Sequence, residues 1–174
     1  MIKAQLIVDD GERCESIELT YNALGAVAAE LPDRLAFAQV YDHLSRHTGG
    51  AVRRAISRHE FLPVSAIKRL ASDPSIGVLE EMLMSSRNRK ELSENEVLAI
   101  CRRDPCLARI VASRIEDFVL DGEKVTAYLE THPDAEIREA MAGNAFAPKQ
   151  VLRRLAQSDP DAQVRAIAGE IVGL

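Results

Sequence analysis

The sequence predicts an all-α protein, a short α-solenoid of stacked helical repeats with a small β-hairpin at its N-terminus. The first observation is a period, because helix-start signals recur at positions 47, 73, 104, 132 and 159, 26 to 31 residues apart. A period in this range is typical of solenoids. The second observation is composition: 47% of the residues are hydrophobic, but only 4% are aromatic and none is Trp. Ala, Leu, Val and Ile must therefore form the core, which favours helices over sheets.

The start signals are mostly Asp-Pro pairs. Asp at an N-cap accepts hydrogen bonds from the first-turn amides, and Pro at the next position has no amide to leave unpaired. Before residues 97–103, where Pro is absent, Ser93 and Glu96 predict a capping box. The five signals are, in order, His47-Thr48, Asp73-Pro74, Asp104-Pro105, His132-Pro133 and Asp159-Pro160.

Each repeat, from one start signal to the next, is predicted to contain two helices. The first follows the start signal, and the second, often preceded by Pro, ends at the next signal. Residues 63–73, PVSAIKRLASD, and residues 148–159, PKQVLRRLAQSD, are two copies of the second-helix segment. A repeat this short cannot bury its own apolar face, so neighbouring repeats must stack to build a continuous core. Apolar residues at helical spacing predict that the last repeat also begins with a helix. The apolar face of this helix consists of Val164, Ile167, Ala168 and Ile171.

Residues 132–170, HPDAEIREAMAGNAFAPKQVLRRLAQSDPDAQVRAIAGE, resemble the leucine-rich repeat variant family and, more broadly, HEAT-like helical repeats. The resemblance is carried by Asp-Pro, then Val-Arg, then Ala-Gly-Asn, then Pro and Leu-x-x-Leu-Ala. Residues 47–74 match well, but residues 75–131 depart, since Leu79 stands where other units have Arg and two units are longer. The resemblance implies a right-handed superhelix of armadillo type that acts as a binding scaffold without catalytic residues. Some members carry a cysteine cluster, which this chain lacks, so no cofactor is expected.

Residues 1–46 differ from the repeats. We expect them to form an N-terminal cap, with residues 47–174 forming an array of about four to five units. Asp10-Gly11 is a turn signal between the apolar stretches 6–8 and 17–19, which predicts the hairpin. Residues 22–46 predict two helices separated at Pro32.

An arginine follows three of the start signals by six residues. Such an arginine can reach the capping Asp of its own or the adjacent unit, which predicts a structural ladder of charge-assisted hydrogen bonds. A row of anion-binding side chains is the alternative interpretation. The ladder residues are Arg53, Arg138 and Arg165 with Asp73, Asp104 and Asp159.

Basic residues cluster at the ends of predicted second helices and form a candidate binding surface. We expect a non-catalytic scaffold that docks a protein or peptide, of acidic character, on the concave face lined by these helices. A HEAT-like nucleic-acid-binding or DNA-base-processing protein is the alternative. Three observations argue against this alternative: the net charge is −5, the chain has no Trp, and the basic pairs Lys68-Arg69 and Arg153-Arg154 are not repeated in the same register by the two repeats between them. The surface comprises Lys68, Arg69, Arg102, Arg103, Arg153 and Arg154.

No catalytic or metal constellation stands out. His43 and His47 have the i, i+4 spacing of a zinc motif, but position 44 is Leu, so HExxH is not formed. Cys101 is expected in the core. Cys106, in the first turn after Asp104, is either a second small buried side chain or a thiol activated by the helix dipole. We therefore predict no metal and no enzyme activity.

The C-terminal residues 166–174, AIAGEIVGL, have no second helix to cover them. Two alternatives stay open: Val172 and Leu174 are exposed and support a homodimer, or the last helix packs under its neighbour. Three cysteines, no signal peptide and no apolar run near the ~20 residues of a membrane span predict a cytoplasmic protein without a membrane partner.

Overall fold

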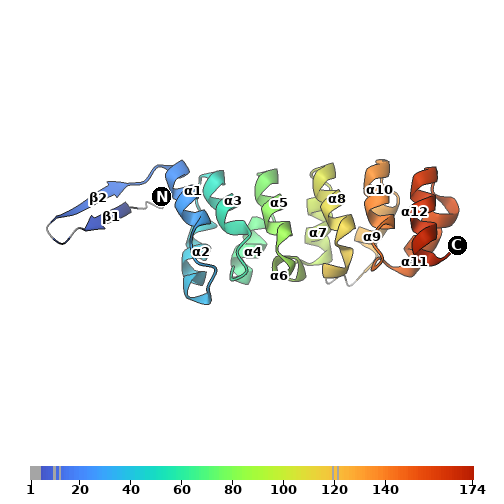
Figure 1. The fold of residues 1–174 in the computed structure, drawn as a ribbon, viewed down its shortest axis with the longest axis horizontal. Helices are drawn as coiled ribbons and strands as arrows, with labels where there is room; N and C mark the ends of the chain where they lie inside the picture. Colours follow the sequence, from blue (N-terminus) through green and yellow to red (C-terminus); the bar gives the residue numbers. More distant parts are fainter. Residues whose placement is uncertain (1–4, 10, 12, 119, 121) are drawn as a thin grey trace. The chain divides into compact units, whose positions relative to one another are not determined.

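A computed structural model describes residues 5–9, 11, 13–118, 120 and 122–174 of the chain. The protein is mostly helical and carries one two-stranded antiparallel sheet (Figure 1). The chain divides into two compact units, Met1–Ser85 and Ser86–Leu174. The helical class and the hairpin are therefore confirmed, while the domain boundary between residues 46 and 47 stays a prediction. Among the described residues, no helix is both long and apolar enough to cross a membrane.

The N-terminal hairpin pairs β1, Gln5–Asp9, with β2, Cys14–Glu18, and places Leu6 opposite Ile17. Gly11 lies in the connecting loop with a positive φ of 87° and donates its amide to Asp9 Oδ1 at 2.9 Å. Only glycine adopts this left-handed conformation at no steric cost. Asp10 of the predicted turn lies outside the described residues, and the second strand ends one residue before the predicted apolar stretch does.

The helices of the first unit form two sets that contact in sequence order. α1 contacts α3 and α3 contacts α5, whereas α2 contacts α4. The predicted split at Pro32 is confirmed, with an added 3₁₀ turn, and the Pro32 carbonyl accepts the buried Tyr41 hydroxyl at 2.5 Å. The helices are α1 Tyr21–Ala29, η1 Leu35–Phe37, α2 Ala38–Leu44, α3 Gly50–Ser57, α4 Val64–Leu70 and α5 Ile76–Met84.

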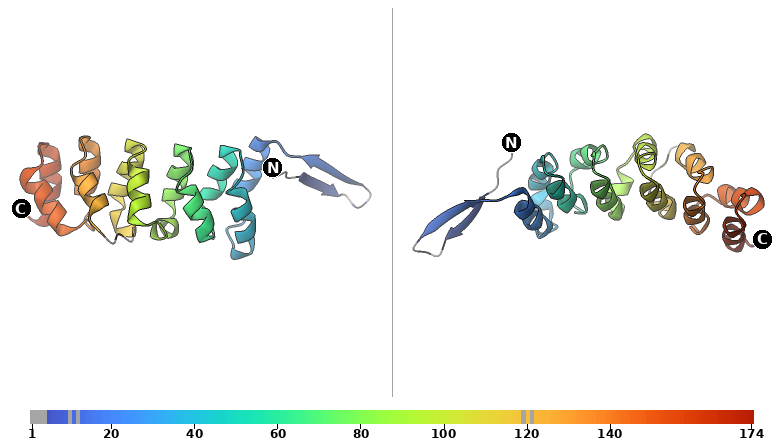
Figure 2. Two further views of the ribbon diagram at one scale, coloured as in Figure 1. Left: turned by 180° about the vertical axis from the view of Figure 1, so that it is seen from behind. Right: turned by 90° about the horizontal axis from the view of Figure 1, so that it is seen from above.

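The second unit repeats this arrangement. α8, α10 and α12 contact in order as first helices, and α7, α9 and α11 contact in order as second helices. Viewed nearly end-on, the two sets form two rows within the unit (Figure 2). The helices are α6 Ser86–Lys90, α7 Glu94–Cys101, α8 Pro105–Ser113, η2 Ile115–Asp117, α9 Lys124–Glu130, α10 Ala135–Ala142, α11 Lys149–Ser158 and α12 Ala162–Val172.

Each unit has an aliphatic core, as the composition predicts. In α8 the buried side chains are Leu107, Ala108, Val111 and Ala112, which recur at helical spacing and form one face. Complete burial of a leucine or isoleucine contributes about 1.5–3 kcal/mol, so a few such faces dominate the stability of each unit. The predicted capping box is present at α7, where Glu96 accepts the Ser93 amide at 2.8 Å.

The two longer repeats contain additional short elements. α6 lies in one and η2 in the other, and Arg89 of α6 bonds Asp117 of η2 through Nε at 3.0 Å. The Arg89 side chain is only 3% exposed. The extra residues that break the period therefore form an ion pair within the second unit, in which the arginine is buried and Asp117 is partly exposed.

Candidate functional site

The five start-signal residues adopt one common turn. In each, a side-chain acceptor takes the backbone amide of the residue two positions later, over distances of 2.8 to 3.1 Å. At His47 and His132 the acceptor is Nδ1, so a histidine ring replaces the aspartate carboxylate. The other three acceptors are Oδ1 atoms of Asp73, Asp104 and Asp159.

Only Asp104 caps a helix in the predicted way, with Pro105 as the first residue of α8. The prediction that Asp73 and Asp159 are N-caps is wrong, because Ser75 and Asp161 hold those positions. The physical reason is that these side chains close a turn before the helix by accepting the amide two residues later, and the same delay occurs at His47 and His132, where Gly49 and Asp134 are the N-caps. A later acid takes over the capping at α12, where Asp161 Oδ1 accepts the Gln163 amide at 2.7 Å.

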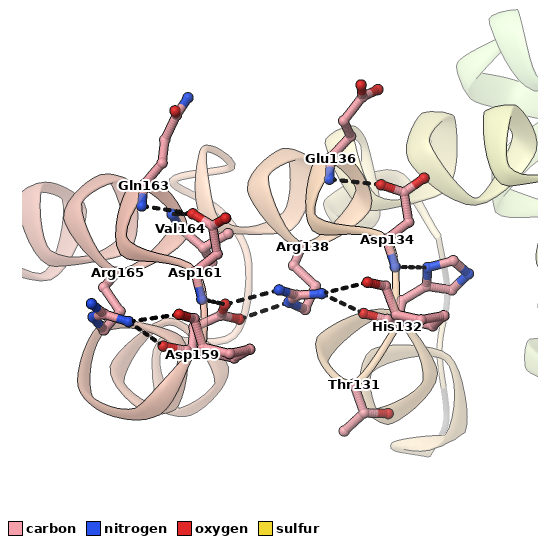
Figure 3. Close-up of polar contacts among 12 residues, drawn as sticks. Thr131, His132, Asp134, Glu136, Arg138, Asp159, Asp161, Gln163, Val164 and Arg165 are labelled. Carbon is pink, nitrogen blue, oxygen red and sulfur yellow. Dashed lines mark hydrogen bonds and ion pairs between the residues drawn. The ribbon is translucent and has the colours of Figure 1, made fainter.

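Arg138 forms the central contact of the ladder (Figure 3). Its Nε lies 2.8 Å from Asp159 Oδ2 and its Nη2 lies 3.1 Å from Asp159 Oδ1. Its Nη1 donates to the carbonyls of His132 at 2.6 Å and Pro133 at 3.2 Å. The guanidinium thus ties α10 both to the turn before it and to the turn that follows α11.

Arg53 makes the same contacts in the first unit. Its Nε and Nη2 lie 2.5 and 3.1 Å from the two carboxylate oxygens of Asp73. Its Nη1 donates to the carbonyls of His47 and Thr48 at 2.7 and 2.9 Å. The two units therefore contain the same four-bond arrangement at equivalent positions.

The burial of these ion pairs indicates that they stabilise the fold. The side chains of Arg138 and Asp159 are 7% and 2% exposed. Burial alone would raise the pKa of Asp159, but hydrogen bonds from Arg138 and from the Asp161 amide outweigh it and hold that pKa below its ordinary value. Loss of one partner would leave the other charge buried without compensation, which is strongly destabilising.

A second repeated contact lies at the opposite end of the first helices. His59 Nε2 lies 3.3 Å from the Ala28 carbonyl in the first unit, and Asn144 Nδ2 lies 3.4 Å from the Ala112 carbonyl in the second. Each of these side chains follows its ladder arginine by six residues, and each acceptor belongs to the preceding first helix. α3 and α10 are therefore each tied near one end to the preceding first helix and near the other end to the turn before the next first helix.

Two predicted ladder residues lie outside this scheme. Arg165 donates Nη1 to the carbonyls of Asp159 at 2.6 Å and Pro160 at 3.1 Å, but it bonds no aspartate side chain among the described residues. Asp104 has no ion pair within the described part of the chain. Leu79 of the first unit stands at the position where other repeats carry the ladder arginine, and its side chain is completely buried.

The candidate basic surface is partly neutralised by acids of this chain. Lys68 and Arg69 belong to the first unit and the other four residues to the second. Arg69 lies 3.3 Å from Asp42 and also bonds the Ser45 hydroxyl. Arg154 Nε lies 2.6 Å from Glu130 Oε1 and Nη2 lies 2.7 Å from Oε2.

The acidic partners were missed from the sequence, although a signal was present. Arg69 and Asp42 are 27 residues apart, and Arg154 and Glu130 are 24 residues apart. On the first helices, Arg109 and Glu136 are likewise 27 residues apart and 3.0 Å distant. Opposite charges separated by one repeat length lie on neighbouring helices of the same row.

A groove of about 510 Å³ lies between the turns that follow α9 and α11. Arg138 and Asp159 also line it, but their charges are already paired with one another. Arg102 places its guanidinium carbon 5.9 Å from the centre of the Tyr128 ring, and that ring lies edge-on to His132 at 5.4 Å. The groove is also lined by the side chains of Thr131, His132, Arg154 and Ser158, with the buried Leu155 at its wall.

The cysteines and histidines have separate environments. Cys101 is 2% exposed, and burial raises the pKa of its thiol to about 12. The expectation that Cys106 is buried as well is wrong, because residue 106 lies opposite the buried face of α8. His43 bonds the Gln39 carbonyl, whereas His47 packs edge-on against Tyr21. In the described residues, no group of three or more His, Cys, Asp or Glu side chains is arranged to hold a metal.

The end of α12 is covered by neighbouring helices on one side and exposed on another. The helix packs on α10 and α11, so it is covered by its neighbours on one side. Leu174 is nevertheless 75% exposed, and Val172 is half-buried. The homodimer stays a prediction.

Comparisons with protein-family models, curated proteins and solved structures find no match for this chain. The resemblance to the leucine-rich repeat variant family therefore stays a prediction from the residues that carry it.

Proposed function

We propose that this chain is a non-catalytic scaffold that binds a protein or peptide on the concave face of a right-handed α-solenoid of leucine-rich-repeat-variant type. The solenoid is supported by the two contacts that recur at equivalent positions in both units, at Arg53 and Arg138 and at His59 and Asn144. Such contacts join neighbours only, as expected for a linear array.

The observation that carries the binding proposal is an aromatic and cationic patch beside the groove of the second unit. We define the Tyr128 patch as Arg102, Tyr128, His132 and Arg154. Tyrosine and arginine are the side chains enriched at the energetic centres of protein interfaces. Arg102 and His132 both contact the Tyr128 ring, and His132 and Arg154 line the same groove. The four side chains therefore lie close together.

The charge of the patch favours an acidic partner. The Arg154 side chain is 56% exposed, whereas Glu130 is 15% exposed. A carboxylate of the partner can therefore approach Arg154 from its solvent side while Glu130 keeps its contact. Arg138, whose charge is buried and paired, is not available for such a contact.

The test is a selection of random displayed peptides against the full chain, followed by affinity measurements on variants. We expect acidic peptides, with affinity reduced about tenfold by Tyr128→Ala or Arg154→Ala, the loss typical of a hot-spot side chain. Arg109→Ala is the matched control, because Arg109 is an arginine of similar exposure, 53%, that forms an ion pair with Glu136 on a first helix. Equal losses for Arg154→Ala and Arg109→Ala would contradict the proposed site. Salt-sensitive binding of duplex DNA in place of peptides would instead favour the nucleic-acid alternative.

A further inference from the structure

The four histidines of the chain divide into two kinds by the role of their ring nitrogens. His43 bonds the Gln39 carbonyl through Nδ1 at 2.7 Å, and His59 bonds the Ala28 carbonyl through Nε2 at 3.3 Å. A carbonyl only accepts, so each of these nitrogens carries a hydrogen. Both contacts persist when the ring gains a proton, because both nitrogens of a protonated histidine are donors.

His47 and His132 are of the opposite kind. Nδ1 of His47 accepts the Gly49 amide at 3.0 Å. Nδ1 of His132 accepts the Asp134 amide at 3.1 Å (Figure 3). A backbone amide only donates, so Nδ1 carries no hydrogen and the neutral ring holds its proton on Nε2. A proton added at Nδ1 would set two donors against each other, so these contacts exist only while the ring is neutral.

The positions of the ladder arginines explain why histidine occurs in these two turns. At Asp73 and Asp159, Oδ1 accepts the equivalent amide, and the carboxylate is also bonded by the ladder arginine of the preceding first helix. Before His47 and His132 this arginine is missing, because α1 contains no arginine and the single arginine of α8 bonds Glu136. A neutral ring thus supplies the acceptor where no arginine balances a carboxylate.

The surroundings of His47 offer nothing to balance a positive charge. Its side chain lies in the interior, at 3% exposure, and no carboxylate of the described residues pairs with the ring. Tyr21 of α1 meets the ring edge-on, with 4.9 Å between the ring centres. Arg53 of α3 bonds the His47 carbonyl and is itself neutralised by Asp73 of the next turn.

The half-buried His132 has similar surroundings. Tyr128 of α9 meets the ring edge-on, and Arg138 of α10 bonds the His132 carbonyl while it is paired with Asp159. No carboxylate of the described residues pairs with this ring either. The other charged groups of the surrounding elements are Arg102, which contacts Tyr128, Glu130, which is paired with Arg154, and Asp134, the N-cap of α10.

We propose that the turns at His47 and His132 form an acid-sensitive switch, in which protonation of the ring opens the turn and loosens the first helix that follows. The amide loses its acceptor, and the turn carbonyls that hold Nη1 of Arg53 and Arg138 are released. Histidine ordinarily changes its charge between about pH 5 and 8. Because the folded turn excludes the proton and the unfolded chain binds it, stability falls as the pH falls through this range. The switch does not depend on partner binding at the Tyr128 patch.

The test compares the five turns within the natural chain by amide hydrogen exchange at about pH 7 and pH 5. Protection is taken relative to the intrinsic exchange rate at each pH, and nitrogen chemical shifts of the imidazole rings report their protonation. At the lower pH we expect the Gly49 and Asp134 amides to lose protection about tenfold, the loss of one hydrogen bond. The amides that bond the aspartate side chains should keep theirs, namely those of Ser75, Cys106 and Asp161.

Asparagine variants separate the switch from other effects of acid. Asn144 Oδ1 accepts the Phe146 amide at 2.9 Å, so asparagine is a neutral acceptor in a turn of this kind. Between about pH 7 and pH 5, His47→Asn and His132→Asn should each reduce the fall in melting temperature by about 2–4 °C. His43→Asn is the matched control and should not reduce it, because the His43 contact persists on protonation.

The proposal is overturned if the rings become protonated while the Gly49 and Asp134 amides keep their protection. It is also overturned if both rings stay neutral down to about pH 5, or if the asparagine variants lose as much stability in acid as the natural chain. An equal loss of protection in all five turns would contradict it as well, because the aspartate turns contain no histidine.

Discussion

Arg138 and Asp159 form a buried two-pronged ion pair that joins α10 to the turn after α11, with Nε 2.8 Å from Oδ2 and Nη2 3.1 Å from Oδ1. Arg154 and Glu130, in the same unit, form an ion pair of similar geometry whose arginine is 56% exposed. The two pairs differ mainly in burial, and burial decides which of them supports the fold and which is available to a partner.

The first prediction compares these pairs directly. Arg138→Ala should lower the free energy of unfolding by about 3 kcal/mol, because it leaves the carboxylate of Asp159 buried and uncompensated. Arg154→Ala should lower it by no more than about 1 kcal/mol, since exposed pairs contribute little. Chemical denaturation of the two variants measures both values. Similar losses would show that burial does not distinguish the pairs.

The second prediction concerns acid stability. The pKa of Asp159 in the folded chain lies below its ordinary value, so its contribution to stability is complete above the unfolded pKa of about 3.9 and is lost as the pH falls through the folded pKa. Asp159→Asn removes this titration. Denaturation midpoints measured from about pH 6 downward should therefore fall more steeply for the natural chain than for the variant. Parallel curves would contradict the assignment.

Most helix positions could be predicted from the sequence because their signals are local. The apolar spacing of α8 and the capping box at Ser93 lie within a few residues of the structure they produce. The sequence places the starts of α5 and α12 two residues early, because Asp73 and Asp159 form the turn before each helix and bond arginines that are 20 and 21 residues away. A rule that considers only neighbouring residues cannot detect that a carboxylate is bonded by an arginine about twenty residues away.

The candidate site was less predictable for the same reason. Arg102 and Arg154 could be named, but the Tyr128 ring against Arg102 and the pairing of Arg154 with Glu130 depend on how neighbouring helices pack. The sequence also treats Arg53, Arg138 and Arg165 alike. Only the structure separates the two that bond an aspartate from the one that bonds no aspartate side chain among the described residues.

A third prediction tests a close contact at the start of α9. A Cβ at Gly122 would lie 2.5 Å from Glu94 Oε2, and Glu94 Oε1 accepts the Lys124 amide at 2.8 Å. Gly122→Ala should therefore destabilise the chain by about 1–3 kcal/mol, as overpacking does.

Gly77 is the matched control for this substitution. It lies within α5, and the nearest atoms to an added Cβ are 3.6 Å away in the Arg54 side chain. Gly77→Ala should stabilise the chain by about 0.5–1 kcal/mol because alanine is the better helix former. Thermal melts of both variants give the comparison, and a change of the same sign in both would contradict it.

A fourth prediction concerns thiol reactivity. Cys14 and Cys106 are exposed, whereas Cys101 is buried and its thiol pKa is about 12. Because the thiolate is the reactive species, a disulfide reagent at neutral pH should modify two of the three cysteines in the folded chain. Denaturant should release the third. Rapid modification of all three without denaturant would place Cys101 outside the core.

The measurement that tests the repeat account most directly is a set of double-mutant cycles by chemical denaturation. Arg53 with Asp73 and Arg138 with Asp159 should each show a coupling energy of about 1–3 kcal/mol, because each pair is in direct contact. Arg53 with Asp159, which belong to different units, should show a coupling near zero and serves as the control. Two similar couplings would support one contact repeated along the chain. Additive effects in both contacting pairs would contradict the ladder that joins neighbouring repeats.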